Sequence, residues 1–121
     1  MKVLIVEDDP IIVRIYTVRF KKEGFETEVV TDGMQALESV RKKVPDVILL
    51  DLVMPNMDGF SFLAALKREK LPTPPTIVLS NLDQSADIHK AREMGVVEYI
   101  VKGKSDLEEI TKKIMQYGKK K

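Results

Sequence analysis

The most informative stretch of the chain is residues 47–59, Val47-Ile48-Leu49-Leu50-Asp51-Leu52-Val53-Met54-Pro55-Asn56-Met57-Asp58-Gly59. Four apolar residues run without interruption and end at a carboxylate, which a segment with proline and glycine follows. This pattern predicts a buried strand followed by a turn, and a buried strand fixes the direction in which Asp51 projects. Asp51 is therefore a candidate functional residue. Which side chains lie near it in the folded domain depends on where the other strands end.

Length and composition narrow the class of protein. The chain has 121 residues with 44% hydrophobic and 32% charged residues, no cysteine and a net charge of +1. We expect one domain over residues 1–121, with a short basic tail at 118–121. The lack of cysteine excludes disulfides, thiolate catalysis and cysteine-based zinc sites. The small net charge does not favour nucleic acid, and no apolar run approaches the ~18 residues of a membrane span, so we expect a cytoplasmic domain.

Strand-like and helix-like segments alternate along the whole chain. Apolar runs predict five strands, at 3–6, 25–30, 47–50, 76–79 and 96–101. Apolar periodicity and capping residues predict five helices, at 10–23, from 33 to the proline at 45, after 58, near 85–94 and after 105.

Two helices carry more detailed expectations. Ile12, Tyr16 and Phe20 recur every four residues and predict an amphipathic first helix, with Ile11 and Ile15 beside that apolar face. Val44 is expected to complete the apolar face of the second helix. Ser105 is the predicted N-cap of the last helix, with Glu108 as its capping-box partner.

Alternation of five strands and five helices predicts an α/β fold with three layers, (βα)5, in which helices cover both faces of a five-stranded parallel sheet. Right-handed crossovers bring the carboxyl ends of all strands to one edge of the sheet, where sites form in such folds. Four of the five strands end in a polar residue or pair: Glu7 and Asp8, Asp51, Ser80, and Lys102. We therefore expect these side chains to lie together.

The chemistry of this group suggests phosphoryl transfer. Three carboxylates and one lysine leave a net charge of about −2, which a divalent cation would compensate. Oxygen ligands without histidine or cysteine favour Mg²⁺ or Mn²⁺ over Zn²⁺. With the cation and Lys102 beside it, Asp51 has the surroundings of a nucleophile that forms an aspartyl phosphate, and the Ser80 hydroxyl is a candidate donor to a phosphoryl oxygen.

The chain resembles a response-regulator receiver domain of two-component signalling, of the chemotaxis-regulator type. The loop Asp51-x-x-Met54-Pro55-x-Met57-Asp58-Gly59 matches the family pattern in full, and Glu7 and Asp8 match its acidic pair. The resemblance covers residues 2 to about 117 and implies a flavodoxin-like fold with strand order 2-1-3-4-5.

The resemblance implies a role for each residue of the acidic group. Asp51 would accept a phosphoryl group from a histidine kinase or a histidine phosphotransfer protein. Asp8 and Asp51 would bind Mg²⁺ directly, Glu7 would act through water, and the backbone carbonyl of Val53 would complete the protein ligands. The protein would not be an enzyme, because it would only catalyse its own phosphorylation and dephosphorylation.

The resemblance also implies a switch. Ser80 would be the switch hydroxyl, Lys102 would pair with the phosphoryl group, and Tyr99 would be the switch aromatic. The change would alter the surface of the fifth strand and the last two helices for a downstream protein target. The domain would be a monomer or a phosphorylation-dependent dimer, without direct contact to nucleic acid or membrane.

One departure and three alternatives remain. The family lysine is usually followed by a cis-linked proline, whereas Gly103 follows Lys102 here. Gly103 is the support for a pseudo-receiver that acts as a phosphorylation-independent interaction module. A phosphatase of the haloacid-dehalogenase type needs a second aspartate at position 53, which is valine. A flavodoxin-like cofactor binder is disfavoured because the acidic residues after the first strand would repel a phosphate.

Overall fold

The computed structural model describes residues 1–118, so residues 119–121 of the predicted basic tail lie outside the described residues. The strands are β1 (Lys2–Val6), β2 (Glu26–Val30), β3 (Val47–Leu50), β4 (Thr76–Ser80) and β5 (Glu98–Val101). The helices are α1 (Pro10–Lys22), α2 (Gly33–Lys42), α3 (Gly59–Arg68), α4 (Ser85–Glu93) and α5 (Leu107–Gly118). The predicted alternation of strands and helices is confirmed.

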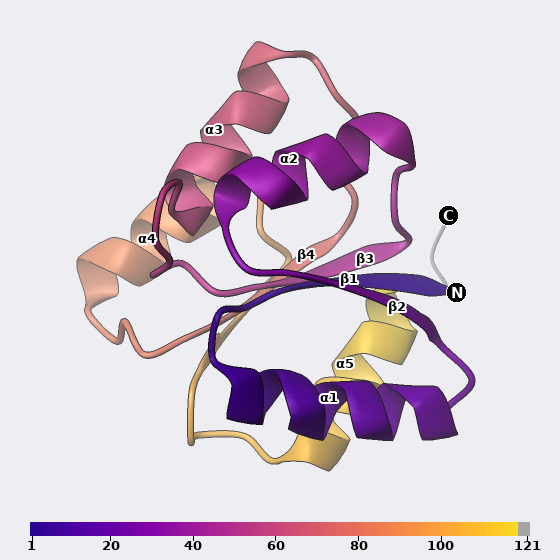
Figure 1. Ribbon diagram of the computed structural model, residues 1–121. Coiled ribbons are helices and arrows are strands. Elements are labelled where there is room, and N and C mark those ends of the chain that lie inside the picture. Colours follow the sequence, from indigo (N-terminus) through magenta and orange to yellow (C-terminus); the bar gives the residue numbers. More distant parts are fainter. Residues whose placement is uncertain (119–121) are drawn as a thin grey trace.

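The five strands form one parallel sheet in the order β2-β1-β3-β4-β5. Helices α2, α3 and α4 cover one face of the sheet, and α1 and α5 cover the other (Figure 1). This arrangement confirms the three-layer (βα)5 flavodoxin-like fold and the strand order that the resemblance implied.

The strands are buried because both faces of the sheet carry apolar layers. Successive side chains of a strand point to opposite faces. Leu4 and Val6 of β1 therefore pack into the core beneath α2–α4, whereas Val3 and Ile5 pack into the core beneath α1 and α5. All residues of the central strands β3 and β4 are buried. The strand ends at the carboxyl edge are thus held by a rigid frame.

The predicted cap of α5 is wrong by one residue. The helix begins at Leu107, so Asp106 occupies the N-cap position, and its Oδ1 accepts the N–H of Glu109 at 2.8 Å. Ser105 lies one residue too early to cap, and Glu108 therefore does not stand three residues after the cap. Both residue types favour N-caps, and the sequence pattern does not separate them.

One prediction about an apolar side chain is also wrong. Val44 lies beyond the end of α2 at Lys42 and is exposed, because the residue before a proline, here Pro45, is disfavoured in helical conformation. Ile11 and Ile15 of α1 are 71% and 48% exposed and face away from the sheet. The outer side of α1 therefore carries exposed apolar side chains.

Candidate functional site

The pairing of β1 with β3 brings two carboxylates side by side. Val6 is the register partner of Leu50, and the backbone N–H of Asp51 donates to the Val6 carbonyl at 2.9 Å. Glu7 and Asp51, each the residue after a paired strand, are only 4% and 6% exposed. Asp8 is exposed beside them, and one oxygen from each of the three carboxylates lies within 4.8 Å of the others.

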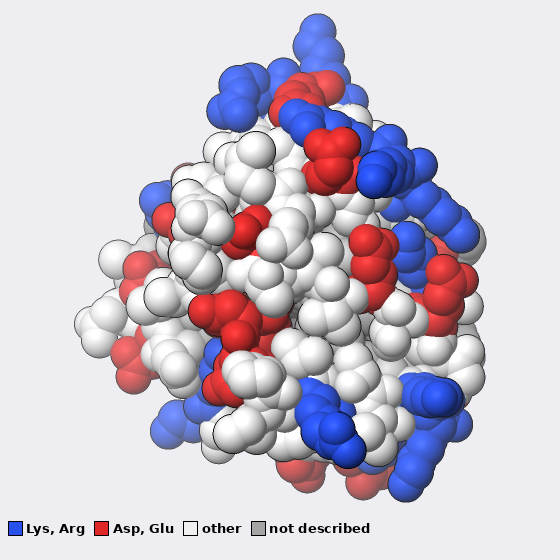
Figure 2. Space-filling model, viewed as in Figure 1, with Lys and Arg blue, Asp and Glu red and all other residues white. Residues whose placement is uncertain are grey.

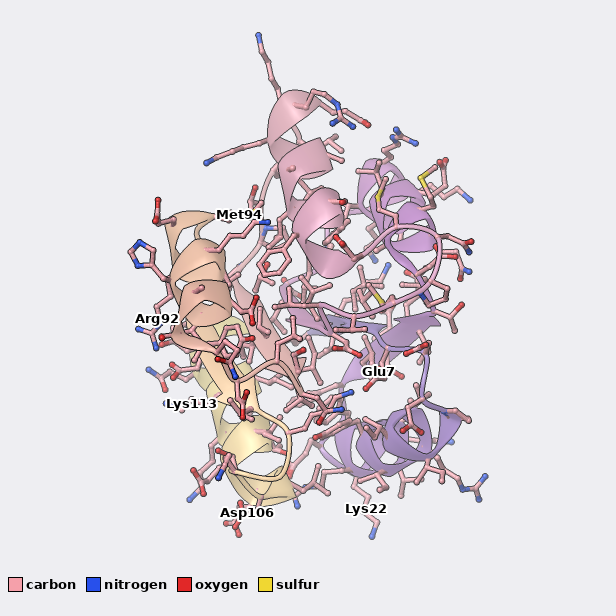
Figure 3. The ribbon with its side chains drawn as sticks, turned by 90° about the vertical axis from the view of Figure 1, so that its left-hand side faces the viewer. Glu7, Lys22, Arg92, Met94, Asp106 and Lys113 are labelled. Atoms are coloured by element: carbon pink, nitrogen blue, oxygen red, sulfur yellow. The ribbon has the colours of Figure 1, made fainter. Side chains whose placement is uncertain are left out.

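Lys102 reaches the same place from β5. Its backbone N–H donates to the Ser80 carbonyl at 2.9 Å, which fixes the chain just after the paired strands β4 and β5. Its Nζ lies 2.7 Å from Glu7 Oε1 and 3.2 Å from Asp51 Oδ2. Figure 3 looks onto this edge of the sheet, with Glu7 between α1 and the helices of the opposite layer.

The electrostatics of the buried pair reflect crowded negative charge. Burial raises the pKa of Glu7 to about 7, and the adjacent Asp51 carboxyl acts in the same direction while Lys102 opposes it. Burial lowers the pKa of Lys102, but the carboxyl groups of Glu7 and Asp51 outweigh that effect and hold it above its ordinary value. One ammonium group thus only partly compensates the acidic group, and Figure 2 shows acidic side chains gathered where β1 leads into α1.

An open depression at this edge fits a hard cation. It is lined by Asp8, Asp9, Asp51, Val53, Asn81 and Lys102. Its acidic side chains offer carboxylate oxygens, which Mg²⁺ and Mn²⁺ prefer. The backbone N–H of Val53 donates to Asp51 Oδ1 at 3.3 Å, so the segment that carries the predicted carbonyl ligand lies against the side chain of Asp51.

The two predicted switch residues both bond to the backbone of one residue, Leu82. Ser80 is fully buried, and its Oγ accepts the N–H of Leu82 at 3.3 Å. The hydroxyl of Tyr99 donates to the carbonyl of the same Leu82 at 2.7 Å. Ser80 therefore does not line the depression, and both side chains depend on the position of the loop between β4 and α4. The sequence patterns could not predict these two hydrogen bonds, because each joins a side chain to a backbone group of Leu82.

The loop after Lys102 adopts a conformation that suits glycine. Gly103 has φ +86°, a value that side-chain-bearing residues rarely adopt, and it is exposed. The residue that departs from the family pattern is thus compatible with this turn, and Lys102 still reaches the acidic group.

The sequence patterns missed one contact near the site. Asp32 is the N-cap of α2, and it also accepts a hydrogen bond from the side chain of Asn56 at 2.9 Å. Residues 32 and 56 lie far apart in the chain and share no periodic pattern, so only a turn signal at each was visible.

A family model described as the response regulator receiver domain matches residues 3–115. The chain belongs to this family. Receiver domains are signalling domains of two-component systems rather than typical enzymes, and the acidic group of Glu7, Asp8 and Asp51 fits the Mg²⁺ site of such domains.

Relatives of the receiver domain agree with this assignment. The chain is 35% identical over 101 residues to the DNA-binding response regulator MtrA of Mycolicibacterium smegmatis, which covers 84% of this chain and 43% of that protein. The chain therefore spans less than half the length of this relative. The receiver domain of the Francisella response regulator 1452 superimposes with a TM-score of 0.88 at 31% identity, covering 98% of this chain and 96% of that one.

A second solved structure is the BeF₃-activated N-terminal receiver domain of Klebsiella pneumoniae RstA. It superimposes with a TM-score of 0.88 at 25% identity, covering 99% of this chain and 100% of that one.

Across residues 1–118, no helix combines the length and apolar character that crossing a membrane requires.

Proposed function

We propose that the receiver domain accepts a phosphoryl group on Asp51 and thereby switches a protein-binding surface. The observation that carries this proposal is the convergence of Glu7, Asp8 and Asp51, with Lys102 bonded between the two buried carboxylates. Nothing in a purely structural ion pair requires a third, exposed carboxylate within 4.8 Å of the other two.

The donor is a phosphohistidine of a histidine kinase or a histidine phosphotransfer protein. A carboxylate oxygen of Asp51 forms a bond to phosphorus as the phosphorus–nitrogen bond breaks, and the electron pair leaves on the imidazole nitrogen. Glu7, Asp8, Asp51 and the Val53 carbonyl would hold Mg²⁺ or Mn²⁺, which neutralises charge on the phosphoryl oxygens when bound. Water later hydrolyses the acyl phosphate. The domain therefore catalyses only the phosphorylation and dephosphorylation of its own Asp51, and it is not an enzyme that turns over a separate substrate.

Lys102 and Ser80 respond to the new group. The Lys102 ammonium, which bonds both buried carboxylates in the unphosphorylated protein, moves to the phosphoryl oxygens because they carry more negative charge than one carboxylate. Ser80 donates its hydroxyl to another phosphoryl oxygen. That movement ends the bond from the Leu82 N–H to Ser80 Oγ and frees the loop before α4 to shift.

The shift reaches the output surface through Tyr99. Its hydroxyl bond to the Leu82 carbonyl ties this half-buried side chain to the same loop. Movement of the loop therefore repositions Tyr99 and changes the surface of β5, α4 and α5 for a downstream protein target. We expect this to occur in the cytoplasm, with the domain a monomer or a phosphorylation-dependent dimer, and without direct contact to nucleic acid or membrane.

The outer side of α1 is the docking surface for the phosphodonor. Ile11, Ile15 and Val18 are exposed at spacings of four and three residues, which places them on one face of the helix. A groove beside α1 is lined by Glu7, Asp8, Pro10 and Arg14, and the apolar face shares Pro10 and Arg14 with it. The donor must approach Asp51 from this edge, so a helical donor surface would cover the apolar face as its histidine reaches the site.

The test is the response of backbone amide resonances to beryllofluoride, which mimics a phosphoryl group. With Mg²⁺ present, we expect shifts around residues 51–57, 80–82 and 99–102, and no such shifts in Asp51→Asn. If Mg²⁺ and beryllofluoride leave the unmutated protein unchanged, the domain is a phosphorylation-independent interaction module.

A further inference from the structure

The start of α2 is bonded to the loop that follows β3. We call residues 51–58 the acceptor loop, and we call Asp32, Gly33, Asn56 and Met57 the loop anchor. Asp32 Oδ2 accepts the side-chain N–H of Asn56 at 2.9 Å, and the backbone N–H of Gly33 donates to the Met57 carbonyl at 2.8 Å. Two parallel links thus join segments that are far apart in the sequence.

The residue types of the loop anchor match what its geometry demands. Asn56 has φ +65°, a conformation in which asparagine is among the few tolerated residues with a side chain. A Cβ on Gly33 would lie 2.6 Å from the Met57 carbonyl oxygen, so only glycine permits this approach. Asp32 is only 6% exposed, and its other oxygen, Oδ1, caps α2 by accepting the Gln35 N–H at 2.9 Å.

The anchor holds one of the two ends of the segment that carries the predicted metal ligand. At the first end, the Gly59 N–H donates to the carbonyl of the buried Leu52 at 3.0 Å. At the second end stand Asn56 and Met57. Of the residues between them, Met54 is half-buried, whereas Val53 and Pro55 are exposed and gain little from core packing. The position of the Val53 carbonyl therefore depends on both fixed ends.

We propose that Asp32 and Gly33 are positioning residues, which act through Asn56 and Met57 to hold the acceptor loop in the geometry that binds Mg²⁺ and accepts phosphate. This inference rests on the proposed function, and it adds two residues at the start of α2 that bond to the end of the acceptor loop far from Asp51. Groups that orient metal ligands without touching the metal commonly change its affinity by about 10- to 100-fold when they are removed.

A charge-conserving exchange tests the hydrogen bond. Asp32→Asn keeps an oxygen to cap α2 but replaces the charge-assisted bond by an amide–amide contact, for which the Asn56 side chain has to turn over, so the link is weakened. Asn56→Asp places two carboxylates together and breaks the same link by repulsion. The double variant Asp32→Asn/Asn56→Asp restores it with donor and acceptor exchanged, and aspartate tolerates the backbone conformation of residue 56. Asp106→Asn at the cap of α5 is the matched control, because Asp106 accepts the Glu109 N–H outside the acceptor loop.

Two readouts separate positioning from stability, both measured where circular dichroism shows a folded protein. Calorimetric titration with Mg²⁺ should give a dissociation constant raised about tenfold in each single variant, recovered to within about twofold in the double variant and unchanged in the control. Amide hydrogen exchange of Gly33 should accelerate in the single variants and slow again in the double variant.

Each possible outcome is decisive. If the unmutated protein binds Mg²⁺ and either folded single variant binds it equally well, the inference is overturned while the proposed function stands. A double variant that stays as weak as the single variants also overturns it. If the unmutated protein does not bind Mg²⁺, the proposed function fails and the inference fails with it.

Discussion

The ammonium group of Lys102 lies where a cation is needed, between the carboxylates of Glu7 and Asp51. It compensates part of the buried negative charge in the absence of metal, and it repels a second cation that approaches the same carboxylates. Lys102 therefore acts in two opposite ways: it stabilises the metal-free site and weakens the binding of Mg²⁺.

Replacing Lys102 by methionine should tighten Mg²⁺ binding. A unit charge and a divalent cation about 4 Å apart in water interact by about 2 kcal/mol, so we expect the dissociation constant to fall about 30-fold. Calorimetric titration from about pH 8 to about pH 9 measures this, because the pKa of Glu7 is raised to about 7 and rises further when Lys102 is removed. Lys104→Met, an exposed neighbour, is the control. Weaker Mg²⁺ binding in Lys102→Met would contradict the electrostatic account.

Asp32 gives a second prediction, on the pH dependence of stability. The Gln35 backbone N–H, followed by the Asn56 side chain, holds the pKa of Asp32 below its ordinary value. A depressed pKa in the folded state adds stability above the unfolded-state pKa of about 3.9 and loses it as the pH falls through the folded-state value. The unmutated protein should therefore unfold at higher urea concentration than Asp32→Asn at about pH 6, and the difference should shrink towards about pH 2.5. If the difference in urea midpoint stays constant or grows on acidification, hydrogen bonds to the ionised Asp32 carboxylate do not stabilise the folded protein.

The sequence predicted some site residues and not others for a physical reason. Asp51, Glu7 and Lys102 stand directly after apolar runs, and parallel strands must bring such positions to one edge. The link between Asp32 and Asn56 joins two turns, and side-chain direction within a turn has no periodicity that a pattern could reveal.

At the scale of elements, α1 has two apolar sides with different fates. Phe20 is buried in the core beneath the sheet, whereas Ile11, Ile15 and Val18 remain exposed. The sequence pattern did not separate the two sides. Hydrophobicity alone does not distinguish side chains that pack on the sheet from apolar side chains that remain exposed on the surface. Hydrophobicity alone also assigned Val44 to the apolar face of α2. Val44 is exposed because the proline that follows it ends the helix earlier.

Ile15→Gln tests the role of α1 in binding the phosphodonor. The side chain is already 48% exposed, so we expect the free energy of unfolding to change by less than about 0.5 kcal/mol. Labelling by acetyl phosphate should be unchanged, because a small donor needs no docking surface. Transfer from a phosphorylated histidine domain, chosen from a panel because it labels the unmutated protein, should slow about tenfold.

The control for this experiment is Val44→Gln, which changes an apolar side chain of similar exposure between α2 and β3. Equal slowing by both variants, or none by Ile15→Gln, would remove α1 from the docking surface.

At the scale of the whole molecule, the fold explains why the site can exist. Buried central strands fix Asp51 and Ser80 at their ends, and crossover helices keep all five strand ends on one edge. The strands and helices followed from apolar periodicity, whereas the strand order came from the family resemblance. Alternation alone does not specify which strand lies next to which.

The central claim is that Asp51 is the phosphoacceptor of a Mg²⁺-dependent switch. Intact-mass measurement after incubation with acetyl phosphate tests it most directly, with the unmutated protein, Asp51→Asn and a sample without divalent cation in parallel. We predict the added mass of one phosphoryl group only in the unmutated protein with Mg²⁺. Labelling that persists in Asp51→Asn, or an unmutated protein that stays unlabelled with Mg²⁺, would contradict the claim.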